Sequence, residues 1–143
     1  MLKDLYYQGI ELEKGKGQTL TPEQIVDYMV KSSVEASLEN NKGKTLSICD
    51  PACGTGRFML GVADYCFANK INFVMWNIDI DERMVEATIE HAVYYKIPAV
   101  VILGDALLND FKKAWQVVDG ISSEVCIAPI IEVFKNLSEK AIK

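Results

Sequence analysis

The stretch Asp50-Pro51-Ala52-Cys53-Gly54-Thr55-Gly56-Arg57-Phe58 organises this 143-residue chain. It follows a β-branched and apolar run, Thr45 to Cys49, and leads into an apolar stretch from Phe58 to Ala68. Glycines lack a Cβ, so the backbone can bend sharply there and a ligand can approach it closely. A helix that follows such a turn points unpaired N–H groups and partial positive charge at the same place. A strand, a glycine turn and a helix in this order predict a nucleotide-type binding site.

The whole stretch resembles the first motif of the S-adenosylmethionine-dependent adenine-N6 DNA methyltransferases, the N-6 DNA methylases. In that family, which includes modification subunits of type I restriction-modification systems, an Asp-Pro-x-x-Gly-x-Gly-x-Phe turn holds the methionine end of the cofactor. The resemblance implies S-adenosylmethionine or S-adenosylhomocysteine as ligand, bound by Asp50, Pro51, Ala52, Cys53, Gly54, Gly56 and Phe58. An ordinary strand-to-helix turn is the alternative interpretation. A dinucleotide is less favoured, because the turn lacks the third glycine of Gly-x-Gly-x-x-Gly.

Composition narrows the class of protein. Half of the residues are hydrophobic, which favours one folded domain over residues 1–143. The net charge of −5 argues against a chain that grips nucleic acid alone, because phosphate contacts dominate such binding. If DNA is the partner, the resemblance therefore implies that another subunit or a further target-recognition segment reads it.

Other sequence features indicate a cytoplasmic chain with no membrane segment and no metal site. No apolar run approaches the ~20 residues of a membrane helix, and the N-terminus lacks a basic region followed by an apolar one. The four cysteines form no Cys-x-x-Cys pair, and the single histidine, His91, completes no zinc set. Buried free thiols in a reducing cytoplasm are the simplest interpretation.

The N-terminal part is predicted to be helical. We expect a short helix over residues 1–13, a flexible break at residues 14–17, and a helix from Pro22 to Leu38 that Thr21 caps. The second helix is expected to bury Ile25, Tyr28, Met29 and Ala36. Gly17-Gln18 followed by Thr21-Pro22 resembles the Gly-Gln-aromatic-aromatic-Thr-Pro segment of the same methyltransferases. The resemblance implies that Thr21 contacts the cofactor and that residues 1–40 pack over its site.

A second strand is predicted over residues 72–79. It ends in Asp79, which lies 23 residues after Gly56, near the spacing at which an acid meets ribose hydroxyls in dinucleotide folds. Asp79-Ile80-Asp81 also resembles the family's second motif, which implies ribose binding by Asp79 and adenine packing by Ile80. Asp81 is expected to cap the next helix, residues 82–95. His91 on that helix is interpreted as a surface or core histidine.

A third strand is predicted over residues 98–103 and is followed by Gly104-Asp105-Ala106-Leu107. A carboxylate at the carboxyl end of a strand can accept a hydrogen bond from an adenine amino group. The segment resembles the family's third motif, which implies that Asp105 contacts adenine and that Ala106 and Leu107 line its pocket. The alternative is a turn aspartate that stabilises its own loop.

The catalytic loop is where the resemblance fails. Adenine-N6 enzymes carry Asn/Asp-Pro-Pro-aromatic after the fourth strand, which contacts the flipped-out base, and this chain has no Pro-Pro pair. We expect a loop or short helix over residues 108–113 and a short fourth strand over residues 116–118. Asp119-Gly120-Ile121-Ser122 then takes the place of the catalytic loop, with Asp119 as candidate catalytic residue. The alternative is an Asp-Gly turn at a strand end. A last helix is predicted over residues 129–142.

Together these elements predict a doubly wound, mostly parallel α/β sheet of the Rossmann-like methyltransferase type, shortened to about four strands. Strand one is expected in the centre, strands two and three on one side and strand four on the other. Three functions remain open: an adenine-N6 DNA methyltransferase, a catalytically inactive cofactor-binding sensor or assembly subunit, and a methyltransferase for a protein or small molecule. Unpaired strand edges in a short sheet favour a homodimer.

Overall fold

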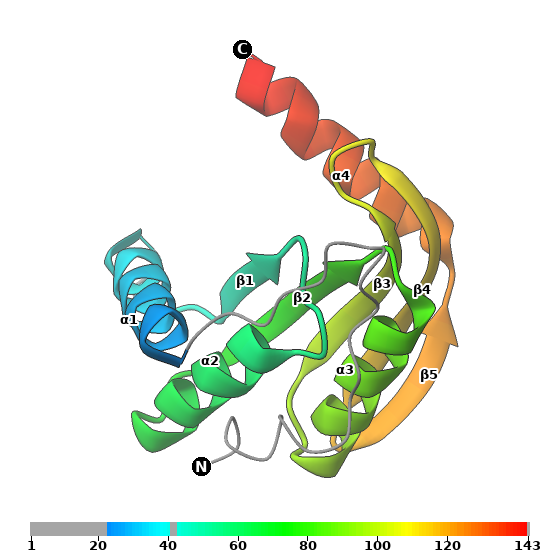
Figure 1. The fold of residues 1–143 in the computed structure, drawn as a ribbon. Coiled ribbons are helices and arrows are strands. Elements are labelled where there is room, and N and C mark those ends of the chain that lie inside the picture. The colour runs from blue at the N-terminus through cyan, green and yellow to red at the C-terminus, as the bar shows by residue number, and fades with distance from the viewer. Residues whose placement is uncertain (1–22, 41–42, 143) are drawn as a thin grey trace.

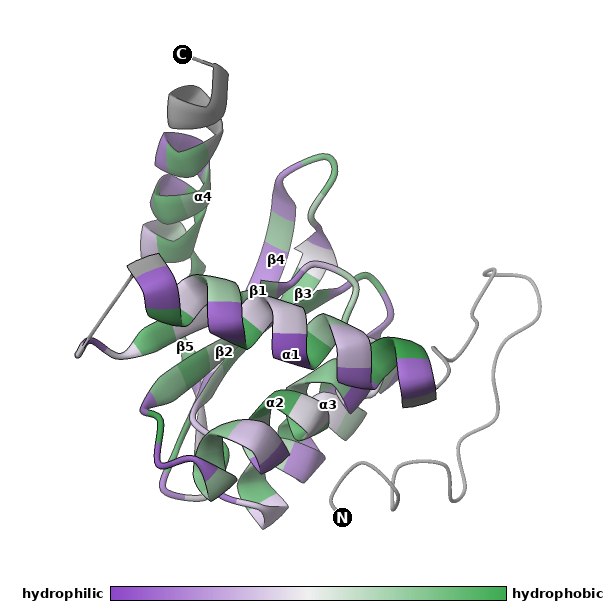
Figure 2. Ribbon diagram, turned by 90° about the vertical axis from the view of Figure 1, so that its left-hand side faces the viewer, coloured by the Kyte–Doolittle hydropathy of each residue, from purple (hydrophilic) through white to green (hydrophobic). Residues whose placement is uncertain are grey.

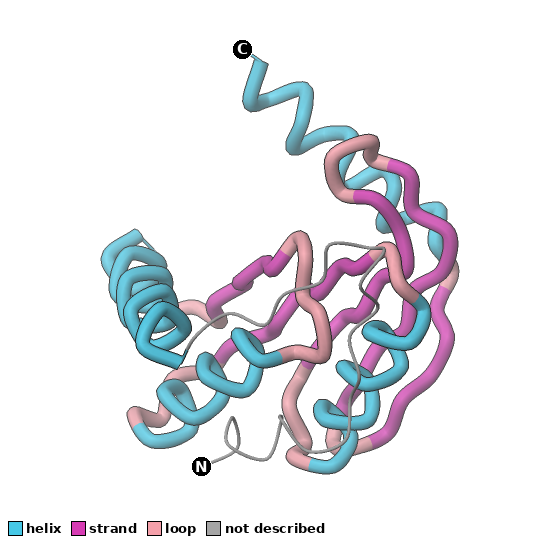
Figure 3. Tube along the Cα trace, viewed as in Figure 1, coloured by secondary structure: helices cyan, strands magenta, loops and turns pink. Residues whose placement is uncertain are grey.

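The computed structural model describes residues 23–40 and 43–142 (Figure 1). In chain order the elements are α1 (Glu23–Asn40), β1 (Leu46–Asp50), α2 (Arg57–Ala68), β2 (Phe73–Asp79), α3 (Glu82–Tyr94), β3 (Ala99–Asp105), β4 (Asp110–Val118), β5 (Ile121–Val125) and α4 (Ile127–Ile142). The strands form one sheet in the order β1-β2-β3-β4-β5 (Figure 3).

The first three strands form the parallel half of the sheet. β1 pairs in parallel with β2 and β2 with β3, and the helical connections α2 and α3 return the chain each time. Both helices pack on one face, where residues of α2 and α3 share a core with alternate strand residues such as Leu46, Met75 and Val101. On the other face Ile130 of α4 packs with Ile78 and Ile102. Helices therefore cover both faces, as the α/β prediction requires.

The last two strands form an antiparallel half, which corrects the predicted topology. β4 pairs antiparallel with β3, and β5 antiparallel with β4. β1 is consequently an edge strand, not the central strand, and no strand of the described part lies beyond it. Residues 110–113 of the segment expected as a loop belong to the nine-residue β4, and of the segment expected as a catalytic loop, Asp119-Gly120 form a turn and Ile121-Ser122 begin β5.

The connection between β4 and β5 explains why these two strands are antiparallel. Asp119 and Gly120 both have positive φ, 50° and 78°, the conformation of a two-residue hairpin turn that Asp-Gly strongly favours. Such a turn reverses the chain at once, whereas a further parallel strand needs a crossover of a dozen or more residues. The alternative interpretation of this segment as an Asp-Gly turn is therefore confirmed.

The buried face of α1 also differs from the prediction. Val26, Val30 and Val34 are buried, whereas Ile25, Tyr28, Met29 and Ala36 are exposed. The valines recur every four residues and form one stripe, and a Cβ added to Gly61 of α2 would lie 2.8 Å from Val30 and 3.3 Å from Val26. Gly61 thus lets the two helices approach closely. The outer side of α1 carries hydrophobic and hydrophilic residues side by side (Figure 2).

The remaining elements follow the prediction. The helix after the glycine turn, the second and third strands, α3 and the last helix all lie within two residues or so of the expected bounds. The last helix, α4, meets β4 and the rest of it extends beyond the sheet (Figure 1). No helix among the described residues is long and apolar enough to cross a membrane.

Candidate functional site

The glycine turn connects the end of β1 to the start of α2. The N–H of Cys53 donates to the carbonyl of Ile78 (2.8 Å), which ties the turn to the neighbouring strand. Gly56 is the N-cap of α2 with φ 92°, and no side chain caps this helix end. A Cβ at position 56 would lie 3.0 Å from Met59 Cε. The left-handed backbone therefore favours glycine at this position, and the close contact with Met59 adds to that preference.

Two carboxylates stand beside this turn. Asp50 ends β1 and its Oδ1 accepts from the N–H of Ala52 (3.2 Å). Asp79 ends β2, two positions beyond Asn77, the residue that pairs with Asp50. Asp79 Oδ2 accepts from the N–H of Gly54 (2.9 Å), and its Oδ1 accepts from the N–H of Asp81 (2.9 Å). The structure therefore brings together Asp50, Ala52, Gly54 and Asp79, as the sequence predicted.

Both carboxylates are held in an unfavourable environment for their charge. Burial raises the pKa of Asp50, and the charge of Asp79 raises it further, against the hydrogen bond from Ala52. Burial likewise raises the pKa of Asp79, while the N–H groups of Asp81 and Gly54 lower it. Carboxylates kept together at a cost to stability are typical of a binding site for a cation or for hydroxyl groups.

The third strand adds a carboxylate at the same edge. Asp105 Oδ1 accepts from the N–H groups of Leu107 (2.9 Å) and Leu108 (3.2 Å). These two hydrogen bonds show Asp105 in its alternative role, in which it stabilises its own loop. Both bonds use Oδ1, and neither uses Oδ2. Ile80, after β2, is 67% exposed, so an apolar surface stands at this edge too. Ala106 is half-buried beside the core on the α4 face.

Two of the residues predicted to bind the cofactor, Cys53 and Phe58, have buried side chains, so only their backbone can contact a ligand. The side chain of Cys53 is buried and lies 3.6 Å from the Thr88 hydroxyl, and burial strongly raises the pKa of its thiol. Phe58 is buried in the core between the sheet and the helices. Pro51 is exposed. The prediction for Thr21 lies outside the described residues.

Asp119 is placed away from this group, which corrects its predicted position. The carboxyl end of β3, Asp105, pairs with the start of β4, so β4 runs back to the amino end of β3, where Ala99 pairs with Val117. Asp119 follows at that end, and a Cβ at Gly120 would lie 3.3 Å from Lys96, which precedes β3. The sheet therefore separates Asp119 from the carboxyl ends of β1, β2 and β3.

Two residues of α3 hold the turn, and neither was predicted from the sequence to do so. The hydroxyl of Thr88 donates to the carbonyl of Gly54 (2.9 Å), and Nδ1 of His91 lies 2.8 Å from the carbonyl of Thr55. Since a carbonyl only accepts, Nδ1 of His91 carries the hydrogen. The available signal was a pair of polar residues three positions apart on the side of the helix that faces the turn.

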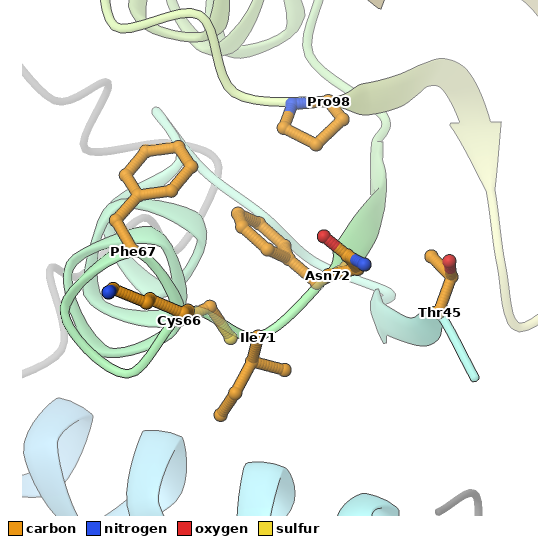
Figure 4. A pocket seen from close by; sticks show the side chains of 8 residues that line it. Thr45, Cys66, Phe67, Ile71, Asn72 and Pro98 are labelled. Atoms are coloured by element: carbon orange, nitrogen blue, oxygen red, sulfur yellow. The ribbon is translucent and has the colours of Figure 1, made fainter. Parts of the chain in front are cut away.

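An open pocket of about 470 Å³ lies elsewhere (Figure 4). It is lined by residues before or at the start of the parallel strands, Thr45, Asn72, Phe73 and Pro98, and by the end of α2 and its loop, Cys66, Phe67, Lys70 and Ile71. This is the amino edge of the parallel strands. In open α/β sheets ligands bind outside the carboxyl ends, where the carboxylates stand, so we assign the candidate site to that edge.

Comparison with solved structures agrees with this fold. The chain is similar to a Listeria monocytogenes protein assigned as a class I S-adenosylmethionine-dependent methyltransferase, with a TM-score of 0.50 and 22% sequence identity over 70% of this chain. The chain spans 29% of the length of that protein. The described part of the chain thus has the Rossmann-like α/β fold of class I methyltransferases.

The sequence itself identifies the family. The profile of the N-6 DNA methylase family matches residues 5–116, and the chain belongs to this family. The match contains the glycine turn and the ends of all three parallel strands. No curated protein matches the sequence.

Proposed function

We propose that this chain is the cofactor-binding part of an adenine-N6 DNA methyltransferase and that its carboxyl edge binds S-adenosylmethionine. The observation that carries the proposal is the arrangement of Asp50 and Asp79 around the Gly54–Gly56 turn. Asp79 offers a carboxylate at the end of β2 for ribose hydroxyls, and Asp105 offers one at the end of β3 for the adenine amino group. Ile80, which follows Asp79, offers an exposed apolar side chain for the adenine ring.

The same arrangement discriminates between classes of ligand. In a phosphate-binding turn the backbone N–H groups face the anion. Here the N–H groups of Ala52 and Gly54 end on the carboxylates of Asp50 and Asp79. The pyrophosphate of a dinucleotide would meet two negative charges, whereas the sulfonium and ammonium groups of S-adenosylmethionine would be attracted by them.

The residues of this chain bind and orient, in this proposal, rather than catalyse. When bound, the cofactor supplies an electrophilic methyl group on its sulfonium. Asp50 and Asp79 hold the charged and hydroxyl groups, so the methyl group keeps one orientation toward an acceptor, and alignment of this kind is the main requirement of direct transfer. The acceptor-binding Asn/Asp-Pro-Pro-aromatic loop is absent from these 143 residues, and Asp119 stands at the other edge.

We therefore propose that the residues that bind the target base, and those that read DNA, come from another segment or subunit. The acidic balance of the chain supports this division, because a surface that grips DNA is basic. A role as a cofactor-binding sensor or assembly subunit is the second candidate. This second candidate is favoured by the position of Asp119 at the amino edge of the parallel strands, because the candidate catalytic residue then lies away from the carboxyl edge.

Calorimetric titration of the purified chain with S-adenosylmethionine, S-adenosylhomocysteine and NAD tests the proposal. We expect micromolar binding of the first two and none of NAD. Absence of S-adenosylmethionine binding, or equal binding of NAD, would overturn it. Transfer of labelled methyl groups to duplex DNA by the isolated chain would contradict the proposed division of labour.

A further inference from the structure

The Gly54–Gly56 turn is held from the side of α3 as well as from the sheet. Thr88 and His91 lie three positions apart, so they project from the same side of the helix. Thr88 donates to the carbonyl of Gly54 at 2.9 Å, and His91 donates to the carbonyl of Thr55 at 2.8 Å. Two consecutive carbonyls of the turn are therefore directed toward α3.

Residue Gly54 is fixed at both of its peptide groups. Its N–H donates to Asp79 at the end of β2, while its carbonyl accepts from Thr88 on α3. Gly54 itself has a positive φ of 56°, a conformation that glycine leaves readily when nothing holds it. Because the N–H of Gly54 donates to Oδ2 of Asp79, a change in the orientation of Gly54 would remove one of the hydrogen bonds that hold the Asp79 carboxylate.

Thr88 does not need this contact to stabilise its own helix. It is fully buried, and a buried threonine in a helix can satisfy its hydroxyl with the carbonyl four residues earlier. The N-terminus of α3 is capped separately by Asp81, which accepts from the N–H of Arg83 at 2.9 Å. The turn also packs directly against Thr88, since a Cβ at Gly56 would lie 3.3 Å from its Oγ1.

We propose that Thr88 and His91 are positioning residues for the cofactor: from α3 they hold the carbonyls of Gly54 and Thr55 and so keep the turn and the Asp79 carboxylate in their ligand-binding arrangement. The inference rests on the proposed function in one respect, the identity of the ligand. It adds α3 to the binding machinery, although neither side chain touches the ligand in this account.

Two pairs of variants test the proposal. Thr88→Val removes the hydroxyl and keeps the shape, and Thr88→Ser restores the hydroxyl. His91→Leu removes the donor, and His91→Asn restores an N–H donor near the position of Nδ1. Glu90→Gln, at an exposed site of the same helix, is the control. The measurement is the affinity for S-adenosylmethionine at a temperature where thermal unfolding shows every variant to be folded.

Thr88→Val and His91→Leu are each expected to weaken binding about three- to tenfold, the effect of one net hydrogen bond. Thr88→Ser, His91→Asn and Glu90→Gln are expected to bind within about twofold of the unmodified chain, well inside that range. Variants that melt earlier but bind with unchanged affinity would overturn the proposal, because a merely structural role predicts that result.

Amide hydrogen exchange of the ligand-free chain separates this inference from the proposed function. Faster exchange at Gly54 and Gly56 in Thr88→Val, with unchanged exchange at Met75 in β2, is expected if α3 holds the turn. Unchanged exchange at both glycines would overturn the holding role. If the unmodified chain does not bind S-adenosylmethionine, the proposed function fails, and the exchange rates still decide whether α3 holds the turn.

Discussion

The parallel and antiparallel halves of the sheet make different use of the same kind of residue. At the carboxyl ends of β1, β2 and β3, the aspartates Asp50, Asp79 and Asp105 meet one edge, and two of them accept hydrogen bonds from the glycine turn. At the end of β4, Asp119 occupies a left-handed position in a hairpin turn at the other edge. A strand-end aspartate therefore indicates a ligand site only when the strand direction brings it to the edge where the other carboxylates lie.

The largest expected effect concerns the junction of the two halves. A Cβ at Gly104, where the pairing of β3 with β4 is irregular, would lie 2.5 Å from the carbonyl oxygen of Asp110 and 2.8 Å from Phe111 Cα. Both are backbone atoms, so the strands must separate. Gly104→Ala should lower the free energy of unfolding in a denaturant titration by about 2–3 kcal/mol. A loss no greater than that of Gly43→Ala, where nothing lies within 4 Å, would contradict the packing described.

The glycine turn should respond in both stability and binding. Gly56→Ala places a side chain at φ 92°, which costs about 1–2 kcal/mol, and pushes against Met59 and Thr88. Because the turn would be displaced, we expect S-adenosylmethionine to bind roughly tenfold more weakly or worse. A tenfold loss of affinity corresponds to about 1.4 kcal/mol of binding free energy. Gly43→Ala carries the same kind of backbone strain, φ 77°, away from the site. Equal affinities in calorimetry for these two variants would remove the turn from the site.

The two kinds of strand-end aspartate can be compared directly. Asp79→Ala should weaken S-adenosylmethionine binding by about 1–3 kcal/mol, because a charged hydrogen-bond acceptor for the ribose is lost. Asp119→Ala, a matched change at the other edge, should leave the affinity unchanged. Titration calorimetry measures both. Weaker binding by Asp119→Ala with full affinity in Asp79→Ala would reverse the assignment of the two edges.

The smallest expected effect is a pH-dependent gain in stability. Since burial and the Asp79 charge raise the pKa of Asp50 above its ordinary value, the folded chain binds a proton more readily than the unfolded chain. Stability therefore falls as the pH rises from the ordinary value through the raised one. Asp50→Asn keeps an oxygen for Ala52 and removes the charge, so it should melt at a higher temperature than the unmodified chain at pH 7.

The gain from Asp50→Asn should shrink as the pH is lowered toward the ordinary pKa of Asp50, where the carboxyl of the unmodified chain is protonated as well. Thermal melts at several pH values measure this difference. A gain that is independent of pH would mean that the charge of Asp50 carries no cost in the folded chain. Asp119→Asn, at the other edge, is the matched control.

The parallel half was predictable because each of its elements has a local signal. The glycine turn, the cap at Asp81 and the aspartates at strand ends all stand in the sequence in the order that the fold uses them. The positions of Asp50, Asp79 and Asp105 at one edge then follow from the rule that parallel strands end together. The sequence shows Thr88 and His91 as two polar residues three positions apart, but their hydrogen bonds to the turn could not be predicted from it, because they depend on how α3 packs.

Of the antiparallel half, only the end of β4 over residues 116–118 was predicted, because the other signals in this half are weak. The alternation of buried and exposed residues in β4 is irregular around Lys112 and Lys113, where the pairing with β3 shifts. In β5 the first four residues are all exposed, so the strand has no buried face to mark it. Asp119-Gly120 was the one signal for a hairpin in this region. The resemblance to the family assigned the same residues to the place of the catalytic loop, so the hairpin stayed an alternative.

The position of the ligand site is tested most directly by amide chemical-shift mapping of the isotope-labelled chain during titration with S-adenosylmethionine. We expect saturable shifts at Gly54, Gly56, Ile80 and Ala106, with none at Gly120 in the β4–β5 turn. Shifts centred on Gly120, or on the residues that line the pocket at the amino edge, would contradict the assignment of the site to the carboxyl edge of the parallel half.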